Sequence, residues 1–450
     1  MATIRSIING FLGLKKDPTA TTQDVAVIKA EDTNAGIVLQ PNGTGAIMAQ
    51  VPDGTATGGN ARGANSVDLQ QNRTINTKVA SGLRSSILSG VDNLNSGNES
   101  VIGGGSSNTI TQERSFIGSG FNNNISGGQS VITGGVNNNV SGLYSIIAGG
   151  SSSLASSNWS TISGGQSNTA STNTHATVVG GSSNTASGQY SVAGGIASVA
   201  SGKGSVATGT NDPGAGNVAS GIGAVALGGR TNASGNYSFT GGRENLTNSG
   251  VASILYGDSN SNTASYNATF GRFNSSSGTY NLAFGQGTIA AYEGAFSFQS
   301  RAATSSVSDR GIAQSHQLTM QKTANLNSAG TTPLTIDGNI LLLIPRANDI
   351  AWNVTVEYVA VCTAAGSGTT VVGDVVTGTD KFRFKRVSGT STIGTVTNIE
   401  LTQDASMTSA ECQYSVGGSN NLQIEFVAPT TANATTFRVV AKVSLVEVAW

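Results

Sequence analysis

The chain has 450 residues, including 61 glycines and 7 prolines, and its 23 basic and 24 acidic side chains leave a net charge of -1. This balance excludes a nucleic-acid-binding surface built from excess Lys and Arg, so no nucleic-acid partner is expected. The 37% hydrophobic content and the periodic glycines exclude a highly charged disordered chain. A chain of this length is expected to form two or three structural units.

Residues 1–84 form the first predicted unit, because they do not keep the repeat that follows them. The starting sequence MATIRSIINGFLGLKKD has no small-residue cleavage site after its apolar part, so we expect no signal peptide and synthesis in the cytoplasm of the producing cell. The aliphatic run at 340–344 is far too short to cross a bilayer, which predicts no membrane insertion.

Residues 85–300 consist of repeats of mostly 14 or 15 residues, such as SVIGGGSSNTITQER at 100–114 and SVITGGVNNNVSGLY at 130–144. A pair of glycines and then an asparagine recur at fixed places in these units. Each unit is predicted to form two short strands joined by turns, and the units stack as a parallel β-solenoid with a ladder of asparagines. The third position of each unit is aliphatic and supplies the predicted core of the coil and trimer: Ile102, Ile117, Ile132, Ile147 and Ile162.

Neighbouring aliphatic residues on one strand predict a second apolar face. Val131 and Ile132, like Ile146 and Ile147, are adjacent and must point to opposite sides of the strand. One side lines the coil, and the other forms a long exposed apolar stripe, which is typical of an interface. The sequence therefore predicts an oligomer.

The repeats resemble a known architecture. The units SVATG at 205–209 and AVALG at 224–228 resemble the head repeats of trimeric autotransporter adhesins, and similar repeats occur in tail-fibre and other virion proteins of bacteriophages. This resemblance implies a left-handed parallel β-roll packed as a homotrimer. The chain lacks the signal peptide, heptad stalk and membrane anchor of the adhesins, which favours a virion protein.

Residues 301–450 form the third predicted unit. Runs such as WNVTVEYVAVC at 352–362 and TFRVVAKVSLVEV at 436–448 alternate in the manner of strands, which predicts a β-sandwich or jelly roll. Cys362 and Cys412 have no metal-ligand spacing and are expected to be buried thiols. The region resembles a terminal β-domain of phage tail-fibre-like proteins, which implies a receptor-binding tip.

Catalytic motifs are scarce. The two histidines, His175 and His316, lie in different regions, and the acidic residues of the repeats are scattered over different units. The chain is therefore predicted not to be an enzyme and to hold no cofactor or metal. Aromatic residues at the unit ends, Tyr144, Trp159 and Tyr190, are candidates for glycan stacking. The alternative is that they are turn residues that pack on the neighbouring coil.

Together these patterns predict an all-β fibre of a bacteriophage virion, most simply a homotrimeric tail fibre. Residues 1–84 would contact other virion proteins, residues 85–300 would form the rod, and residues 301–450 would bind a host-surface glycan or protein through multivalent, non-covalent contacts. Three alternatives remain open: a head fibre or structural spacer of the virion, a bacterial trimeric surface adhesin, and a glycan-degrading fibre. The last requires two carboxylates in one pocket.

Overall fold

The computed structural model describes residues 41, 43–209, 216–299, 313–326, 331–336, 339–340, 350–366, 370–416, 422–429 and 435–449. Over these ranges the chain is built from β-strands, with one 3-10 turn at Ala405–Met407. The predicted all-β class is confirmed. Residues 1–40, which make up about half of the predicted attachment unit, lie outside the described ranges.

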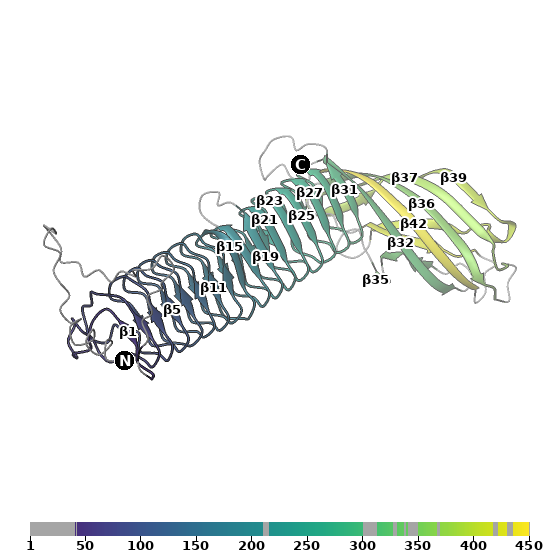
Figure 1. The fold of residues 1–450 in the computed structure, drawn as a ribbon. Coiled ribbons are helices and arrows are strands. Elements are labelled where there is room, and N and C mark those ends of the chain that lie inside the picture. The colour runs from purple at the N-terminus through teal and green to yellow at the C-terminus, as the bar shows by residue number, and fades with distance from the viewer. Residues whose placement is uncertain are drawn as a thin grey trace, which may run out of the picture.

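A parallel β-solenoid forms a long rod, with the N-terminal coils at one end and a broader β-domain at the other (Figure 1). One strand of every coil joins the first sheet of the rod. These strands are β1 (Ile47–Met48), β2 (Val67–Asp68), β3 (Ser86–Ile87), β5 (Val101–Ile102), β7 (Phe116–Ile117), β9 (Val131–Ile132), β11 (Ile146–Ile147), β13 (Thr161–Ile162), β15 (Thr177–Ser182), β17 (Val192–Ile196), β19 (Val206–Gly209), β21 (Val225–Gly229), β23 (Phe239–Arg243), β25 (Ile254–Asp258), β27 (Ala268–Arg272), β29 (Leu282–Gln286) and β31 (Phe296–Gln299).

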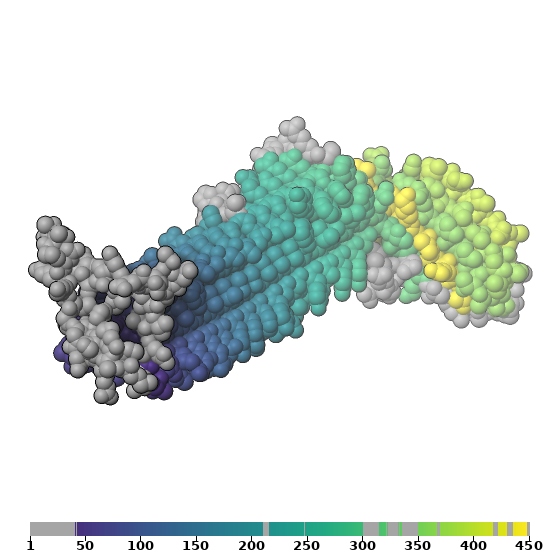
Figure 2. Space-filling model, viewed as in Figure 1, coloured from purple at the N-terminus to yellow at the C-terminus, as the bar shows by residue number. Residues whose placement is uncertain are grey.

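The second strand of each coil joins another parallel sheet on a different face of the rod. Its strands are β4 (Leu94–Asn95), β6 (Thr109–Ile110), β8 (Asn124–Ile125), β10 (Asn139–Val140), β12 (Leu154–Ala155), β14 (Thr169–Ala170), β16 (Thr185–Ala186), β18 (Val199–Ala200), β20 (Val218–Ala219) and β22 (Asn232–Ala233). A third sheet continues towards the tip with β24 (Thr247–Asn248), β26 (Ser261–Asn262), β28 (Ser275–Ser276) and β30 (Ile289–Ala290). Equivalent positions of successive coils therefore form straight columns, visible as ridges along the rod in Figure 2.

The strand registers explain why the repeat needs its period. Ile132 pairs with Ile117 on one side and with Ile147 on the other, so the third position of each unit forms a continuous column. All three side chains are fully buried inside the coil. A contiguous buried cluster built from this column and the facing strands extends from Ala80 to Ala233. Burial of these apolar side chains stabilises each coil against its neighbours.

Asparagine side chains form a ladder inside the corner that follows the glycines. The backbone N–H of Asn138 donates to Oδ1 of Asn123 at 3.1 Å, and its Nδ2 donates to the carbonyl of Gly150 at 3.0 Å. The same arrangement recurs at Asn108, Asn184 and other coils. Each amide satisfies buried backbone groups that no strand pairs at the corner. The predicted asparagine ladder is confirmed.

A buried ionic cluster lies near the N-terminal end of the described part of the rod. Strands β1 and β2 extend the parallel stack before residue 85. Asp68 Oδ2 accepts hydrogen bonds from Arg62 Nε at 2.8 Å and Arg73 Nη2 at 3.3 Å, and all three side chains are fully buried. A polar end coil is what a solenoid requires to protect its first interface from water. The predicted unit boundary at residue 84 stays a prediction.

The C-terminal domain is a sandwich of two antiparallel sheets. The large sheet contains β32 (Ala313–Leu326), β42 (Thr435–Ala449), β36 (Ile350–Ala364), β37 (Val375–Val387), β38 (Thr390–Ile393), β39 (Thr397–Gln403) and the short strands β34 (Thr335–Ile336) and β35 (Asn339–Ile340). The small sheet contains β33 (Thr331–Pro333), β41 (Leu422–Val427) and β40 (Glu411–Val416). Their facing sides share one buried core, in which the rings of Phe426 and Phe437 lie 5.7 Å apart. We call this domain the tip.

The tip is joined directly to the rod. The last rod strand, β31, pairs antiparallel with β32, so that Ser297 lies opposite His316. The first sheet of the rod is therefore continuous with the large sheet of the tip. This shared sheet fixes the tip at the end of the rod (Figure 1).

Candidate functional site

The aromatic candidates lie on one corner of the rod, where each coil turns back into the first sheet. The rings of Tyr144 and Trp159 stack with centroids 5.5 Å apart and planes within 4°. His175 occupies the same corner in the next coil and continues the stack, 5.1 Å from Trp159 and 4.9 Å from Tyr190. Four rings from four successive coils therefore form one column on the outside of the rod.

This stacking restricts where a sugar can bind. Inside the column each ring covers the face of the next, so Trp159 has neighbours on both sides. Gly204 takes the corner in the coil after Tyr190 and has no side chain, so the face of Tyr190 towards Gly204 is uncovered. Tyr144 is hydrogen-bonded at its hydroxyl by Gln129 Nε2 at 3.3 Å. The stacking favours the packing alternative for Tyr144 and Trp159 and leaves Tyr190 as the residue with an open ring face.

The corner holds its aromatic residues in a left-handed backbone conformation. The φ angles of Tyr144, Trp159, His175 and Tyr190 are 58°, 54°, 63° and 58°. For a residue with a bulky side chain this conformation costs about 1–2 kcal/mol. Stacked ring pairs contribute about 0.5–1.5 kcal/mol each, which is of similar size. Stacking between coils thus offsets the backbone cost of placing rings at this corner.

Two members of the corner column were not singled out by the sequence pattern. His175 belongs to the first stack, although it reads in the sequence as an isolated loop residue. Tyr266 stacks on Tyr280 in a second stack nearer the tip, with centroids 5.1 Å apart and planes within 5°. The signal that identifies both is their place, the last position of a unit. A fixed period does not reveal this last position, because the unit lengths vary between 14 and 16 residues.

The predicted coil and trimer core splits into inner and outer positions. Ile102, Ile117, Ile132, Ile147 and Ile162 are fully buried within a single coil, so they are not available to a second chain. Their outward neighbours are exposed instead: Ile146 retains 42% of its surface and Phe116 retains 41%. A contact with another chain through the first sheet would therefore use its outward positions.

The large sheet of the tip carries a cationic depression on its outer face. Lys381, Arg383 and Lys385 alternate along β37 and are all exposed on this side of the sheet. They line an open depression of about 680 Å³ together with residues of β36, β38 and the loop after it, among them Asn353 and Thr395. No Asp or Glu is among the lining residues. The depression is suited to a negatively charged or hydroxyl-rich ligand.

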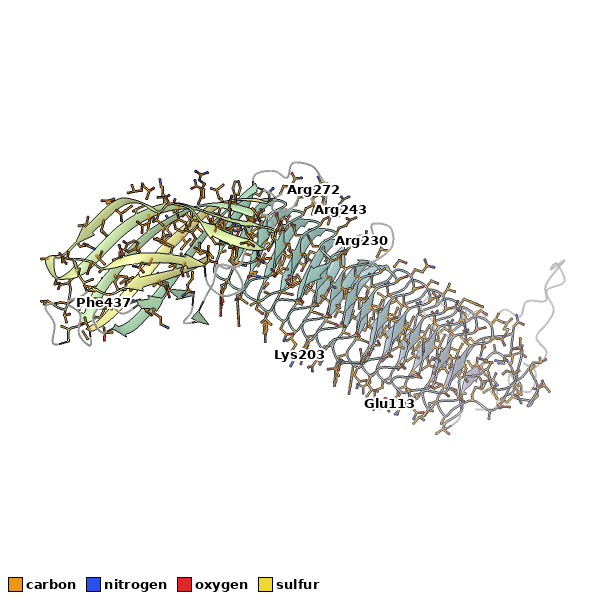
Figure 3. The ribbon with its side chains drawn as sticks, turned by 180° about the vertical axis from the view of Figure 1, so that it is seen from behind. Glu113, Lys203, Arg230, Arg243, Arg272 and Phe437 are labelled. Carbon is orange, nitrogen blue, oxygen red and sulfur yellow. The ribbon has the colours of Figure 1, made fainter. Side chains whose placement is uncertain are left out.

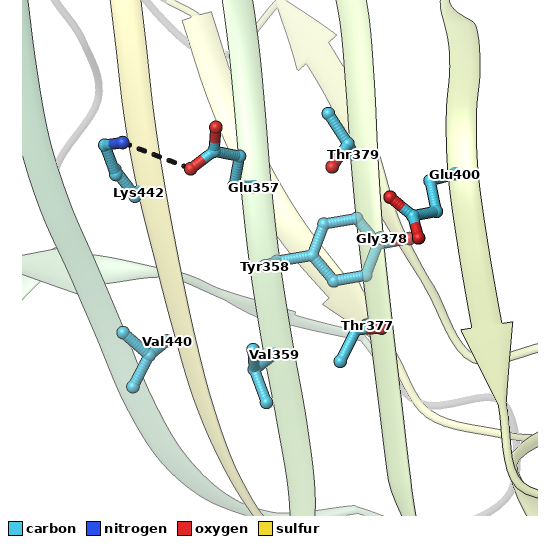
Figure 4. Close-up of a pocket in the computed structure, with 9 residues that line it drawn as sticks. All are labelled: Glu357, Tyr358, Val359, Thr377, Gly378, Thr379, Glu400, Val440 and Lys442. Carbon is cyan, nitrogen blue, oxygen red and sulfur yellow. Dashed lines mark hydrogen bonds and ion pairs between the residues drawn. The ribbon is translucent and has the colours of Figure 1, made fainter.

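A second, smaller depression lies further along the same face and contains two carboxylates (Figure 4). Glu357 on β36 and Glu400 on β39 flank Thr379 of β37 in the strand register. Glu357 pairs with Lys442 at 3.2 Å, and both side chains are about half exposed. The ring of Tyr358 lies over Gly378, where an added Cβ would be 2.4 Å from the ring. Burial raises the pKa of the Tyr358 hydroxyl.

A polar cluster is buried inside the tip. Asp380 is 3% exposed and accepts hydrogen bonds from the Tyr414 hydroxyl at 2.7 Å and from Asn398 Nδ2 at 3.0 Å. Burial raises the pKa of the Asp380 carboxyl. Cys412 and Cys362 are free buried thiols, as expected, and burial raises the pKa of both. Asp380 and Cys412 are enclosed by the sandwich, whereas Asn398 reaches Asp380 from the exposed strand β39.

The junction between rod and tip contains another buried polar group. Ser297 Oγ lies 2.6 Å from His316 Nδ1, and His316 Nε2 lies 4.0 Å from Glu447 Oε2. Trp352 Nε1 donates to the same carboxylate oxygen at 2.9 Å. All four residues are buried, so this Ser–His–Glu series joins β31, β32, β36 and β42 rather than opening to solvent. Sequence reasoning missed it because its members are up to 150 positions apart.

Three acidic residues of the rod, Glu99, Glu244 and Asp258, form ion pairs between coils. Glu99 pairs with Arg84 and Arg114, and Asp258 pairs with Arg243 and Arg272. Guanidinium hydrogen bonds lower the pKa of the Glu99 carboxyl. No cluster of three metal-ligating side chains occurs in the ranges that the structure describes. The same ranges contain no helix long and apolar enough to span a membrane.

No protein-family model and no curated protein matches the chain. Solved structures similar to it include three phage tailspike proteins. The tailspike of Acinetobacter baumannii phage AM24 is 9% identical, with 87% of this chain and 68% of that chain covered and a TM-score of 0.21. The tailspike gp49 of Acinetobacter baumannii bacteriophage Fri1, a capsular polysaccharide depolymerase, is 9% identical, with 89% and 70% covered and a TM-score of 0.21. The tailspike of Acinetobacter phage vB_ApiP_P1 is 8% identical, with 90% and 81% covered and a TM-score of 0.21.

Likenesses this weak assign no activity, substrate or partner to this chain. One sequence-based prediction is nevertheless contradicted: the chain was expected not to be an enzyme, and the Fri1 neighbour is a depolymerase. That prediction is withdrawn. The resemblance to adhesin heads stays a prediction. A glycan-degrading fibre requires two carboxylates in one pocket. Among the described residues, Glu357 and Glu400 share one depression, and this depression lies on the tip and not on the rod.

Proposed function

We propose that the chain is a structural and adhesive fibre of a bacteriophage virion, a tail fibre that mediates attachment to the host surface. Residues 1–84 contact other virion proteins, residues 85–300 form the rod, and residues 301–450 form the receptor-binding tip. The observation that carries the proposal is the continuous sheet from β31 to β32, which fixes an irregular β-domain at the end of a long regular rod. The fibre is made in the host cytoplasm and functions on the virion.

The tip is better suited than the rod to recognise a receptor. Most side chains of the rod recur at equivalent places of successive coils and form columns, which suits a spacer whose stability is a sum of similar interfaces. The tip instead combines the three cations of β37 with polar groups from neighbouring strands in one depression. Specific recognition requires such a non-repeating set of groups on a rigid scaffold. A host-surface glycan or protein with negative charge fits this depression.

The fibre is proposed to be a homotrimer. Outward apolar residues such as Phe116 and Ile146 are left exposed by a single chain, and an exposed stripe of this kind is typical of an interface. Three tips on one rigid assembly bind a repetitive cell surface with greater avidity than one tip, without any new contact.

The proposal is tested by competition for adsorption. The purified full-length chain should reduce adsorption of the parent phage to its host cells, and a variant with Lys381→Gln, Arg383→Gln and Lys385→Gln should lose at least tenfold in potency, because the tip depression then has no positive charge. The matched control removes three exposed rod cations through Arg84→Gln, Arg114→Gln and Lys203→Gln, and should compete like the original chain. If both variants compete equally well, the tip is not the receptor-binding part.

A further inference from the structure

The coils nearest the tip differ from the others in having a polar interior. In the coils between Ser238 and Gln299 most inward positions of the strands hold buried polar side chains, and the remaining three hold Leu255, Ala283 and Ala290. The polar ones are Thr240, Asn248, Asn262, Thr269, Ser276 and Ser297. Neither contiguous cluster of buried hydrophobic residues includes a residue between Ala233 and Tyr292. This part of the rod therefore has less of the aliphatic filling that stabilises the earlier coils, with Leu255 as its one large buried aliphatic side chain among the described residues.

Hydrogen bonds between side chains connect part of this polar interior, whereas the buried hydroxyls of Thr269 and Ser276 have no hydrogen-bond partner in the part of the chain that the structure describes. Asn248 Nδ2 donates to Thr240 Oγ1 at 2.9 Å, and Asn262 Nδ2 donates to Asn248 Oδ1 at 3.1 Å. Asn267 Nδ2 donates to Asn262 Oδ1 at 2.9 Å. A net intramolecular hydrogen bond contributes about 1 kcal/mol, whereas a fully buried aliphatic side chain contributes about 1.5–3 kcal/mol. Each of these coils thus gains less from its own interior than a coil built on isoleucine.

The same coils are apolar on the outside of the first sheet. In the coils from β5 to β13 the second outward position of each strand holds small or polar residues such as Gly103, Gly118 and Ser163. In the coils from β23 to β31 eight of the ten outward positions hold large apolar residues, and the other two hold Gly241 and Ala268. We call this set the outer aromatic stripe: Phe239, Ile254, Tyr256, Phe270, Leu282, Phe284, Phe296 and Phe298.

A single chain leaves much of the stripe in water. Ile254, Tyr256, Phe284, Phe296 and Phe298 are 39% to 53% exposed. With roughly 200 Å² of surface for a large side chain, these five leave roughly 450 Å² uncovered, which matches the largest patch normally found on a monomer. It is also about half of what each partner buries in a standard interface, before any surrounding residue is counted.

Charged residues border the stripe at the corner where the strands end. Arg243 and Arg272 both pair with Asp258 at 3.3 Å. Arg230 pairs with Glu244 at 3.2 Å, and these two residues directly follow the ends of β21 and β23. In Figure 3 these arginines follow one edge of the rod, opposite the edge that carries Glu113 and Lys203. An apolar centre with a charged border is the usual arrangement of an interface.

We propose that the outer aromatic stripe packs against the same stripe of further copies of this chain, so that the hydrophobic core of the coils between Ser238 and Gln299 lies between chains and not within one. A copy of the chain is the occupant because the stripe repeats once per coil, at about 4.8 Å. Only a partner with the same rise per repeat meets every ring in register, and a parallel copy has that rise. That the assembly has three chains, and that these chains are parallel, rests on the proposed function. The location of the contact does not.

The stacked pair Phe270 and Phe284 tests the proposal, because the same two coils contain a matched pair of rings. Phe270 and Phe284 stack at 5.1 Å on the stripe, and Tyr266 and Tyr280 stack at 5.1 Å on the corner. In the full chain, Phe270→Ser with Phe284→Ser should raise the dissociation constant for self-association at least about tenfold, and Tyr266→Ser with Tyr280→Ser should leave it unchanged. Sedimentation equilibrium provides the measurement. Equal association of both variants and the original chain overturns the proposal.

Cross-linking of the intact surface keeps the test decisive if the double serine variant fails to fold. The two natural cysteines are buried in the tip, so an introduced cysteine on the rod is the reactive one. Phe284→Cys should form disulfide-linked chains under mild oxidation, and Tyr280→Cys should not. Linked chains from Tyr280→Cys alone contradict the proposal. If the chain is trimeric but Phe284→Cys does not link, the location is wrong and the trimeric fibre still stands.

Discussion

At the scale of single residues, the corners of the coil depend on one glycine of each pair. Gly135 has φ of 104°, and an added Cβ would be 2.2 Å from the carbonyl oxygen of Gly150 in the next coil. Gly134 has no such conflict, because an added Cβ would be 3.6 Å from its nearest neighbour. The sequence predicts a turn at the glycine pair but does not distinguish its members, since the close approach comes from the adjacent coil.

The difference between these glycines gives a direct prediction. Gly135→Ala should lower the free energy of unfolding by more than about 2 kcal/mol, because it combines backbone strain with a clash against a backbone carbonyl. Gly134→Ala should change it by less than about 1 kcal/mol. Denaturant unfolding of both variants, each followed by circular dichroism, measures the difference. Equal losses would mean that the corner is not constrained by the neighbouring coil.

At the scale of elements, the period predicts the strands and their inward column but not the character of each coil. Ile132 and Ile147 are identifiable as inward residues because the repeat is regular there. Near the tip, the polar residue Thr240 points into the coil and the apolar residue Phe239 points outward. Because side chains simply alternate along a strand, polarity alone does not show which of the two faces is the interior. The buried cap at Asp68 was missed because Arg62 and Arg73 reach it from irregular segments.

The cap supplies a prediction for the first coils. Asp68→Asn leaves two buried guanidinium groups without a counter-charge and should lower the free energy of unfolding by about 3–5 kcal/mol. Glu99→Gln removes an exposed partner of Arg84 and Arg114 and should lower the free energy of unfolding far less, because water and salt screen exposed ion pairs. Hydrogen exchange should place the loss in the coils around β2 and β3. Uniform exchange along the whole rod would show that Asp68 does not act as a cap.

At the scale of the whole molecule, the order of rod and terminal β-domain follows from the sequence, whereas the surface of the tip does not. The period stops near residue 300, and the alternating runs beyond it predict a sandwich. Its binding surface depends on which strands become neighbours. Trp352 and Glu447 meet across 95 positions, and the cations of β37 face a depression only because β36 and β38 lie beside them. Such non-local pairings are not readable from strand periodicity.

The central claim is that the chain is a virion fibre with its tip at the free end. Electron microscopy of the parent particles, labelled with an antibody against residues 350–449, tests this claim most directly. The account predicts label at the outer ends of fibres that project from the tail, because the sheet shared by β31 and β32 fixes the tip at the end of the rod. Label at the base of the fibres, on the capsid, or on the surface of uninfected bacteria would contradict it.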